Sequence, residues 1–219
     1  MTVSLYTNNY KSLQLSSCMN LHALRAFYQK HRVIIKQRLS DFSSLSPEQH
    51  FHELLFCLLT PASNAHRCWA AVKELRQLKR PTPAAIRALL RKYTRFHNQK
   101  AHAVMEAYKL WPVIQQKLSH PHSREVRDWL ANNVRGLGLK ESSHFLRNIG
   151  RSNNELAILD RHVLRNLRML SIIADERIKS QRQYREVEQR FLALARRVRI
   201  PAEHLDLLFW SMETGEVFK

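Results

Sequence analysis

Apolar residues recur every three to four positions along most of this 219-residue chain. The stripe formed by Val126, Trp129, Leu130 and Val134 is one example. Such spacing places apolar side chains on one face of an α-helix, whereas a half-buried strand would alternate them at every second position. The chain also has only four glycines and seven prolines, which are few for an all-β protein. We therefore predict an all-α fold.

Capping residues and prolines set the expected limits of several helices. Ser46 followed by Pro47 is typical of a helix start, and Pro61 should end that helix because the residue before a proline disfavours the helical region. Further helices are predicted over residues 98–111 and 123–133.

The charge of the chain favours a polyanionic partner. It has 36 lysines and arginines against 18 acidic residues, a formal net charge of +18. Nucleic acid is the first candidate partner, and a membrane surface is the second. The basic residues are interspersed with apolar ones at helical spacing, which indicates a folded basic face rather than a charged tail.

The cysteines and histidines give no support to a metal centre. Cys18, Cys57 and Cys68 include no Cys-x-x-Cys pair, so neither a disulfide framework nor a zinc or iron–sulfur site is predicted. We expect no cofactor and no catalytic metal. The chain has no apolar run of eighteen residues, and its first residues lack a signal pattern, so we expect a cytoplasmic protein associated with the nucleoid.

Two of the four glycines, Gly136 and Gly138, separate two apolar stripes. The pattern predicts a helix, a tight turn and a second helix over residues 123–149, that is, a helix-hairpin-helix. The glycines and the start of the second helix would let a phosphate approach backbone amides. The alternative is a turn that only packs two helices together, which a Gly-x-Gly alone would favour. The residues expected to bind the DNA backbone are Arg135, Gly136, Leu137, Gly138 and Arg147.

Lys140 and Asp160 are the candidate catalytic residues. Lys140 comes at the start of the second helix, where a cation opposes the helix dipole, and such a locally unfavourable choice is typical of a functional position. A lysine amine can act as a Schiff-base nucleophile. Asp160 is placed to cap the next helix, and a carboxylate held by helix amides can also accept and donate protons. The alternatives are an exposed surface lysine and a purely structural cap.

The residues from Val134 to Gly150, followed by Leu156-Ala-Ile-Leu-Asp-Arg-His162, resemble the helix-hairpin-helix DNA glycosylases. The resemblance is strongest to the 8-oxoguanine DNA glycosylase/AP lyase family of archaea and some bacteria. Residues 56–65 and the final Met-Glu-Thr-Gly-x-Val-x-Lys also resemble that family, so the likeness runs from about residue 50 to residue 219. One departure is Ala62, where relatives often carry glutamine, and it leaves a base contact at that position without support.

The resemblance implies a single glycosylase unit made of two helical subdomains with a base-binding cleft between them. Residues 45–150 would form the middle subdomain, and residues 1–44 with 151–219 would form the other. Lys140 and Asp160 would face each other across the cleft. Lys140 would attack the anomeric carbon and remain as a Schiff base, Asp160 would assist its deprotonation and the departure of the base, and β-elimination would cleave the strand 3′ to the abasic site.

The implied activity is base-excision repair of 8-oxoguanine in duplex DNA by a monomer. The damaged nucleotide must be flipped out of the helix, because chemistry cannot reach a stacked base. Phe209 and Trp210 are candidates to stack on it, although such residues also suit a core. An acceptor near Lys219 is the candidate partner for the N7 hydrogen of 8-oxoguanine; the terminal carboxylate is one such group, and a frayed end is the alternative. Further candidate phosphate or opposite-strand contacts are His144, Arg147 and Arg161.

Two other functions remain open from the sequence. One is a related glycosylase for another damaged base, and the other is a DNA-binding module without catalysis. The module would lose only a little affinity when Lys140 is replaced by glutamine, whereas either enzyme would lose its covalent chemistry. The sequence also leaves open the preferred opposite base, the balance of base removal and strand cleavage, and a monovalent ion at the hairpin.

Overall fold

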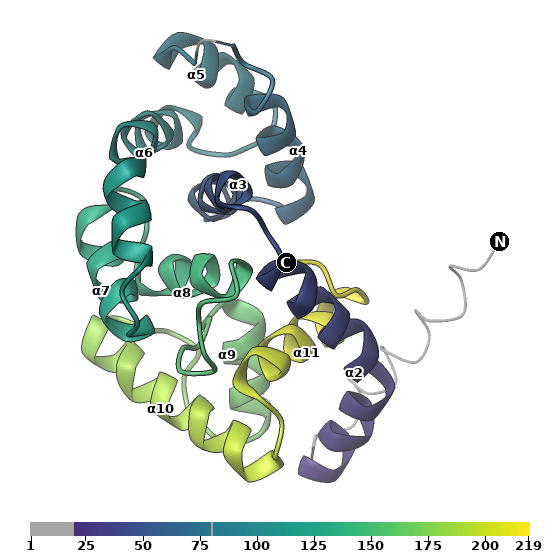
Figure 1. Ribbon diagram of the computed structural model, residues 1–219. Helices are drawn as coiled ribbons and strands as arrows, with labels where there is room; N and C mark the ends of the chain where they lie inside the picture. The colour runs from purple at the N-terminus through teal and green to yellow at the C-terminus, as the bar shows by residue number, and fades with distance from the viewer. Residues whose placement is uncertain (1–19, 80) are drawn as a thin grey trace, which may run out of the picture. The chain divides into compact units, whose positions relative to one another are not determined.

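The computed structural model describes residues 20–79 and 81–219, and every regular element in this part of the chain is an α-helix (Figure 1). The all-α prediction is confirmed. Contacts divide the chain into two compact units, one of residues 43–151 and the other of residues 152–219 together with the N-terminal residues up to Phe42. Among the described residues, no helix has the length and apolar character that crossing a bilayer requires.

The unit of residues 43–151 is built around one buried helix, α3 (Pro47–Leu59). All residues from His52 to Leu59 are buried, as expected of a helix surrounded by others. It packs against α4, α6 and α8, and Figure 1 shows it between α4 and α6. The remaining helices of this unit are α4 (Ala65–Leu75), α5 (Pro83–Arg91), α6 (His97–Leu118), α7 (Ser123–Asn133) and α8 (Leu139–Asn148).

The ends of α3 follow from the sequence. The Ser46 side chain accepts a hydrogen bond from the Gln49 amide at 3.3 Å, and the Gln49 side chain accepts one from the Ser46 amide at 2.8 Å. This reciprocal pair is a capping box, and Pro47 occupies the first helical position. The helix ends at Leu59, with Thr60 as its cap and Pro61 following. Both predicted limits are confirmed.

Helix α6 extends further than the sequence predicts. A helix was expected over residues 98–111, but α6 continues through Pro112 to Leu118. A proline inside a helix removes one hydrogen bond and costs about 3 kcal/mol. Ile114 and Leu118 are both buried on the far side of the proline, and burial of their side chains offsets that cost. The packing of the last turns therefore overrides the local signal.

A buried lysine holds the end of α3 and the loop that follows it. Lys100 of α6 is only 7% exposed, and its Nζ atom donates to the carbonyls of Leu59 and Pro61 and to the Ser63 hydroxyl at 2.7–2.8 Å. Burial lowers the pKa of Lys100, while three oxygen acceptors satisfy its ammonium group. The terminal carbonyl of α3 thus finds its partner in a different helix.

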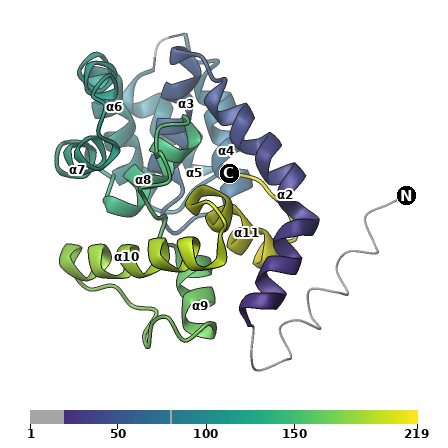
Figure 2. The ribbon, with the colours of Figure 1, turned by 60° about the horizontal axis from the view of Figure 1, so that its bottom comes forward.

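The other unit contains α2 (Leu21–Ser43) up to Phe42, α9 (Arg161–Met169), α10 (Gln181–Val198) and α11 (Ala202–Thr214). Helix α11 packs against both α9 and α10, and Figure 2 shows the three together. Arg25 of α2 donates to the carbonyls of Arg197 and Val198 at the end of α10. The Tyr28 hydroxyl lies 2.9 Å from Nδ1 of His204 and joins α2 to α11.

Gly150 follows α8 and must remain a glycine. Its φ is +67°, and an added Cβ would lie 2.8 Å from Cα of Ser43. Gly150→Ala should therefore lower the free energy of unfolding by about 3–5 kcal/mol, because left-handed strain and a backbone clash add together. Gly215→Ala is the matched control, since its φ is +82° but nothing lies within 4 Å, and it should cost about 1–2 kcal/mol. Equal losses in urea unfolding of the two variants would contradict this prediction.

Four histidines that are partly or fully removed from solvent should make stability depend on pH. Burial lowers the pKa of His204 from its usual 6.5, and it has the same effect on His50, His52 and His162. Below about pH 6.5 the unfolded chain therefore binds more protons than the folded one, so the free energy of unfolding falls as pH falls. We expect a smaller loss between about pH 7.5 and about pH 5.5 in His204→Gln than in the wild type.

The control for this measurement is His22→Gln, because His22 is exposed. Urea unfolding of the three proteins at both pH values gives the comparison. The histidine account fails if His204→Gln loses as much stability on acidification as the wild type and the His22 variant.

Candidate functional site

The predicted helix, turn and helix over residues 123–149 is present. Helix α7 ends at Asn133, residues 134–138 form the turn, and α8 begins at Leu139 and packs against α7. The turn is closed by a hydrogen bond from the Leu137 amide to the Val134 carbonyl at 3.1 Å. The Val134 and Leu137 side chains are buried, so they anchor the turn. Any contact of Leu137 with DNA would come from its backbone.

The two glycines of the turn serve different purposes. Gly136 has a φ of +89°, which favours glycine, and a Cβ there would be tight against Leu58 at 3.1 Å and Ala103 at 3.2 Å. Gly138 is extended, with a φ of −99°, and is the N-cap of α8. Its N–H donates to Oε2 of Glu141 at 3.2 Å. A Cβ at Gly138 would lie 3.2 Å from that same oxygen, so the glutamate carboxylate occupies the space beside the N-cap.

Lys140 is the second residue of α8 and lies beside that N-cap. Its Nζ atom forms an ion pair with Oε1 of Glu141 at 2.8 Å. The Lys140 side chain is 26% exposed and that of Glu141 is 14% exposed, so the pair is partly shielded from water. Sequence reasoning missed Glu141, although a glutamate three residues after an N-cap is a recognised capping signal.

The second half of α8 faces the interior of its unit. Arg147 is only 4% exposed and His144 only 9%, because this part of the helix packs against α3 and α7. The His144 ring meets the Phe56 ring edge to face at 5.6 Å. The expectation that these two side chains reach DNA phosphates is therefore corrected. Arg135 is different, because it is exposed on the hairpin, where it pairs with Glu106 at 3.2 Å.

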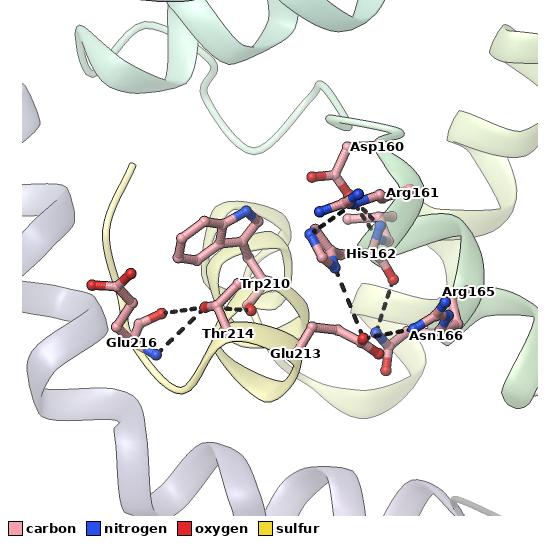
Figure 3. Close-up of polar contacts among 10 residues, drawn as sticks. Asp160, Arg161, His162, Arg165, Asn166, Trp210, Glu213, Thr214 and Glu216 are labelled. Carbon is pink, nitrogen blue, oxygen red and sulfur yellow. Dashed lines mark hydrogen bonds and ion pairs between the residues drawn. The ribbon is translucent and has the colours of Figure 1, made fainter. Parts of the chain in front are cut away.

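Asp160 is the N-cap of α9 in the other unit. Its Oδ1 atom accepts hydrogen bonds from the amides of His162 and Val163 at 2.8 and 2.9 Å, as Figure 3 shows in part. The capping role predicted from sequence is confirmed. The second oxygen, Oδ2, has no hydrogen-bond partner among the described residues. One oxygen thus fixes the carboxylate on the helix, and the catalytic role of the other stays a prediction.

A polar cluster surrounds the start of α9 and joins it to α11 (Figure 3). Glu213 of α11 accepts from Arg165 at 2.9 Å and lies 3.9 Å from Nδ1 of His162. Burial lowers the pKa of His162, while the Asp160 carboxylate acts in the opposite direction. The Trp210 ring meets the His162 ring edge to face, with 6.2 Å between centroids and an angle of 77° between the planes. Glu213 has no local sequence signal, because its partners, Arg165 and His162, come from another helix.

The two aromatic residues proposed for base stacking differ in exposure. Phe209 is fully buried and packs edge to face on Phe191 at 6.3 Å, so its assignment to the base pocket is corrected to a core position. Successive helical residues lie about 100° apart, which is why one side chain enters the core and its neighbour does not. Trp210 is partly exposed and lies 6.4 Å from the ring of Phe218.

The last residues of the chain are packed rather than frayed. Val217 is buried, and Nζ of Lys219 lies 5.5 Å from the centre of the Phe42 ring in α2. This contact places residue 219 against its own unit.

Lys140 belongs to the unit of residues 43–151 and Asp160 to the other, and their opposition across a cleft stays a prediction. Within the described part of the chain, no group of three His, Cys, Asp or Glu residues could hold a metal ion.

Comparison with known proteins gives a consistent set of similarities. A family model described as 8-oxoguanine DNA glycosylase matches residues 35–200. A protein of Fusobacterium nucleatum named 8-oxoguanine DNA glycosylase/AP lyase is 34% identical, over 90% of this chain and 96% of its own length. A protein of the same name from Korarchaeum cryptofilum is 36% identical, over 86% of this chain and 91% of its own length.

Solved structures agree with these matches. The 8-oxoguanine DNA glycosylase of Thermotoga maritima has a TM-score of 0.83 and 28% identity, and the match covers 96% of this chain and all of that one. The 8-oxoguanine glycosylase/lyase of Methanocaldococcus jannaschii was solved with a 15mer DNA containing 8-oxoguanine. Its TM-score is 0.80 at 29% identity, and the match covers 90% of this chain and 99% of that one.

Proposed function

Because this chain belongs to the 8-oxoguanine DNA glycosylase family, we propose that it excises 8-oxoguanine from duplex DNA and cleaves the strand at the abasic site that remains. The observation that carries this proposal is similarity over nearly the whole chain to proteins named for both activities. The positions of Lys140 at the start of α8 and of Asp160 at the start of α9 supply residues suited to such chemistry.

Lys140 is the proposed nucleophile. Its neutral amine would attack C1′ of the damaged nucleotide, and the electrons of the glycosidic bond would leave with the base, which takes up a proton. Opening of the sugar ring then gives a Schiff base between Nζ and C1′. Loss of a proton from C2′ expels the 3′ phosphate and cleaves the strand. The partly shielded position of the side chain supports a role of this kind.

Asp160 is the proposed proton carrier. The amides of His162 and Val163 fix its Oδ1 atom, so the carboxylate is aimed before any substrate arrives. The uncommitted Oδ2 atom would accept the proton that Lys140 loses and would help the base to depart. A carboxylate held in this way needs no reorganisation during the reaction, which is the advantage of a capping position.

The hairpin and the basic surface are the proposed DNA contacts. The amides of the first turn of α8 that follow Gly138 and the exposed Arg135 side chain would bind the phosphates of the strand. The relative from Methanocaldococcus jannaschii was solved with DNA that contains 8-oxoguanine, which supports DNA as the partner. We propose that the protein acts on it as a monomer.

The proposed base pocket includes Trp210 and residue Lys219. Trp210 is partly exposed beside His162, where its ring could stack on a flipped base. 8-Oxoguanine carries a hydrogen on N7 that guanine lacks, so recognition requires an acceptor aimed at that hydrogen. The packed end of the chain, with Lys219 against Phe42, could hold such an acceptor in place.

The test is a reaction with two duplexes that differ only in one base, 8-oxoguanine or guanine. The released base and the cleaved strand are quantified, and borohydride is added to trap a covalent adduct. We expect free 8-oxoguanine, a cleaved strand and an adduct with the damaged duplex alone. Excision of a different lesion from a wider panel would favour a related glycosylase, and DNA binding without any release would favour a binding module.

A further inference from the structure

Glu213 of α11 is a largely buried carboxylate that joins its helix to α9 (Figure 3). Its side chain is only 9% exposed. Its Oε2 atom accepts a hydrogen bond from the Arg165 guanidinium at 2.9 Å and lies 3.9 Å from Nδ1 of His162. Arg165 and His162 are three positions apart on α9, so they share one face of that helix. One carboxylate oxygen therefore contacts this face at two places.

Trp210 lies on the same face of α11 as Glu213, because the two residues are three positions apart. The Trp210 ring meets the His162 ring edge to face. His162 thus has Glu213 near Nδ1 and Trp210 against its ring, while its Nε2 atom accepts from Nε of Arg161 at 3.3 Å. The imidazole ring is therefore held from three sides.

In the described part of the chain, packing holds the Trp210 ring, and its indole N–H forms no hydrogen bond. One ring contact is with His162, and another is with Phe218 of the C-terminal tail, at 6.4 Å between centroids. A ring that is not fixed by a hydrogen bond takes its orientation from the side chains that pack against it. His162 is thus the contact through which α9 orients Trp210.

His162 also contacts the candidate proton carrier. Its backbone amide donates to Oδ1 of Asp160 at 2.8 Å. The same residue therefore meets Asp160 with its backbone and Trp210 with its ring. A carboxylate that fixes this ring also fixes the place of Trp210 relative to Asp160.

We propose that Glu213 is a positioning residue that holds His162 against Trp210 and thereby fixes the ring on which the flipped base would stack. This proposal rests on the function proposed above for Trp210. An abasic site offers no base for stacking, so the reaction at such a site does not require a fixed Trp210 ring. Loss of Glu213 should therefore slow removal of the base and leave the chemistry at an abasic site unchanged.

The first test needs no DNA and uses fluorine NMR of protein that contains 5-fluorotryptophan. The chain has four tryptophans, and the other three, Trp69, Trp111 and Trp129, belong to the unit of residues 43–151. Loss of one signal in Trp210→Phe identifies the signal of Trp210. We expect Glu213→Ala to shift or broaden this signal alone. An unchanged Trp210 signal would overturn the proposal, and so would equal changes in all four signals, which would indicate an effect on the whole fold.

The second test measures single-turnover rates on two duplexes, one with 8-oxoguanine and one with an abasic site. Glu213→Ala should lower release of 8-oxoguanine by about tenfold, within the range that stacking of a base on an aromatic ring contributes. Borohydride trapping at the abasic site should stay within about twofold of the wild type. Equal losses on both duplexes would overturn the proposal, because Glu213 would then act on the chemistry shared by the two reactions.

Glu186→Ala is the matched control. Glu186 also pairs with an arginine of its unit, Arg182 at 3.0 Å, but this pair is exposed and lies within one helix. The control should leave both rates and the Trp210 signal unchanged. Glu213→Gln keeps an acceptor for Arg165, so it should lose less base release than Glu213→Ala. The reverse order would contradict a role through this contact.

The two tests also separate this proposal from the function on which it rests. Absence of base release by the wild type would refute the proposed excision of 8-oxoguanine. The fluorine signals of Glu213→Ala would still decide whether Glu213 fixes the Trp210 ring.

Discussion

Lys140→Gln should abolish the covalent adduct that borohydride traps with a duplex containing 8-oxoguanine. Glutamine cannot form a Schiff base, so strand cleavage should fall by roughly 10³-fold or more. Glutamine is close to lysine in its reach along the surface of α8, and position 140 is partly exposed, so the fold should persist. Gel analysis of the trapped adduct and of the cleaved strand gives the measurement.

Lys109→Gln is the control for this variant, because Lys109 is exposed in the same unit and the substitution removes the same charge. It should retain both adduct and cleavage. Binding of the duplex should change little in either variant. Normal trapping by Lys140→Gln would exclude this lysine as the nucleophile, and normal cleavage without trapping would point to hydrolysis by water.

Asp160→Asn should reduce base excision by about 10²–10⁴-fold, the usual contribution of a group that transfers protons. Asparagine caps helices as well as aspartate does, so the bonds to the amides of His162 and Val163 can remain. The free energy of unfolding should therefore stay near that of the wild type. Single-turnover release of 8-oxoguanine and urea unfolding measure the two effects separately.

Asp160→Ala serves as the comparison, because it removes both the cap and the carboxylate. It should show the same catalytic loss and should also lose about 1 kcal/mol of stability. If Asp160→Asn excises 8-oxoguanine at the wild-type rate, the carboxylate has only its capping role, and the proton must be carried by another group.

The helix limits that could be predicted are those set by local chemistry. The ends of α3 depend on residues next to them in the sequence, namely Ser46 and Pro47 at the start and Thr60 and Pro61 at the end. Asp160 caps α9 by a similar local bond. The part of helix α6 beyond residue 111 was not predicted, because burial of its last turns depends on residues that are far away in the sequence. Tertiary packing cannot be inferred from the sequence around Pro112 alone.

The residues of the candidate site also divide into those that local chemistry predicts and those that depend on packing. The hairpin glycines, Lys140 and Asp160 could be proposed from the sequence because each breaks or fulfils a local rule, and their roles in catalysis and DNA binding stay predictions. Arg147 and Phe209 were misassigned because the sequence gives their helix but not which side faces the interior. Glu213 was missed because its partners, Arg165 and His162, belong to a helix about fifty residues earlier in the chain.

The buried cations change what the net charge of the chain means for binding. Lys100 and Arg127 are 7% and 1% exposed, and their charges are directed to oxygen acceptors inside one unit. Such residues cannot displace condensed counterions from a nucleic acid, and each phosphate that a protein does neutralise changes the logarithmic salt slope by about −0.9. The slope of a salt titration therefore reports only the cations of the outer surface. Part of the formal charge of +18 instead stabilises the loop after α3 and helix α7.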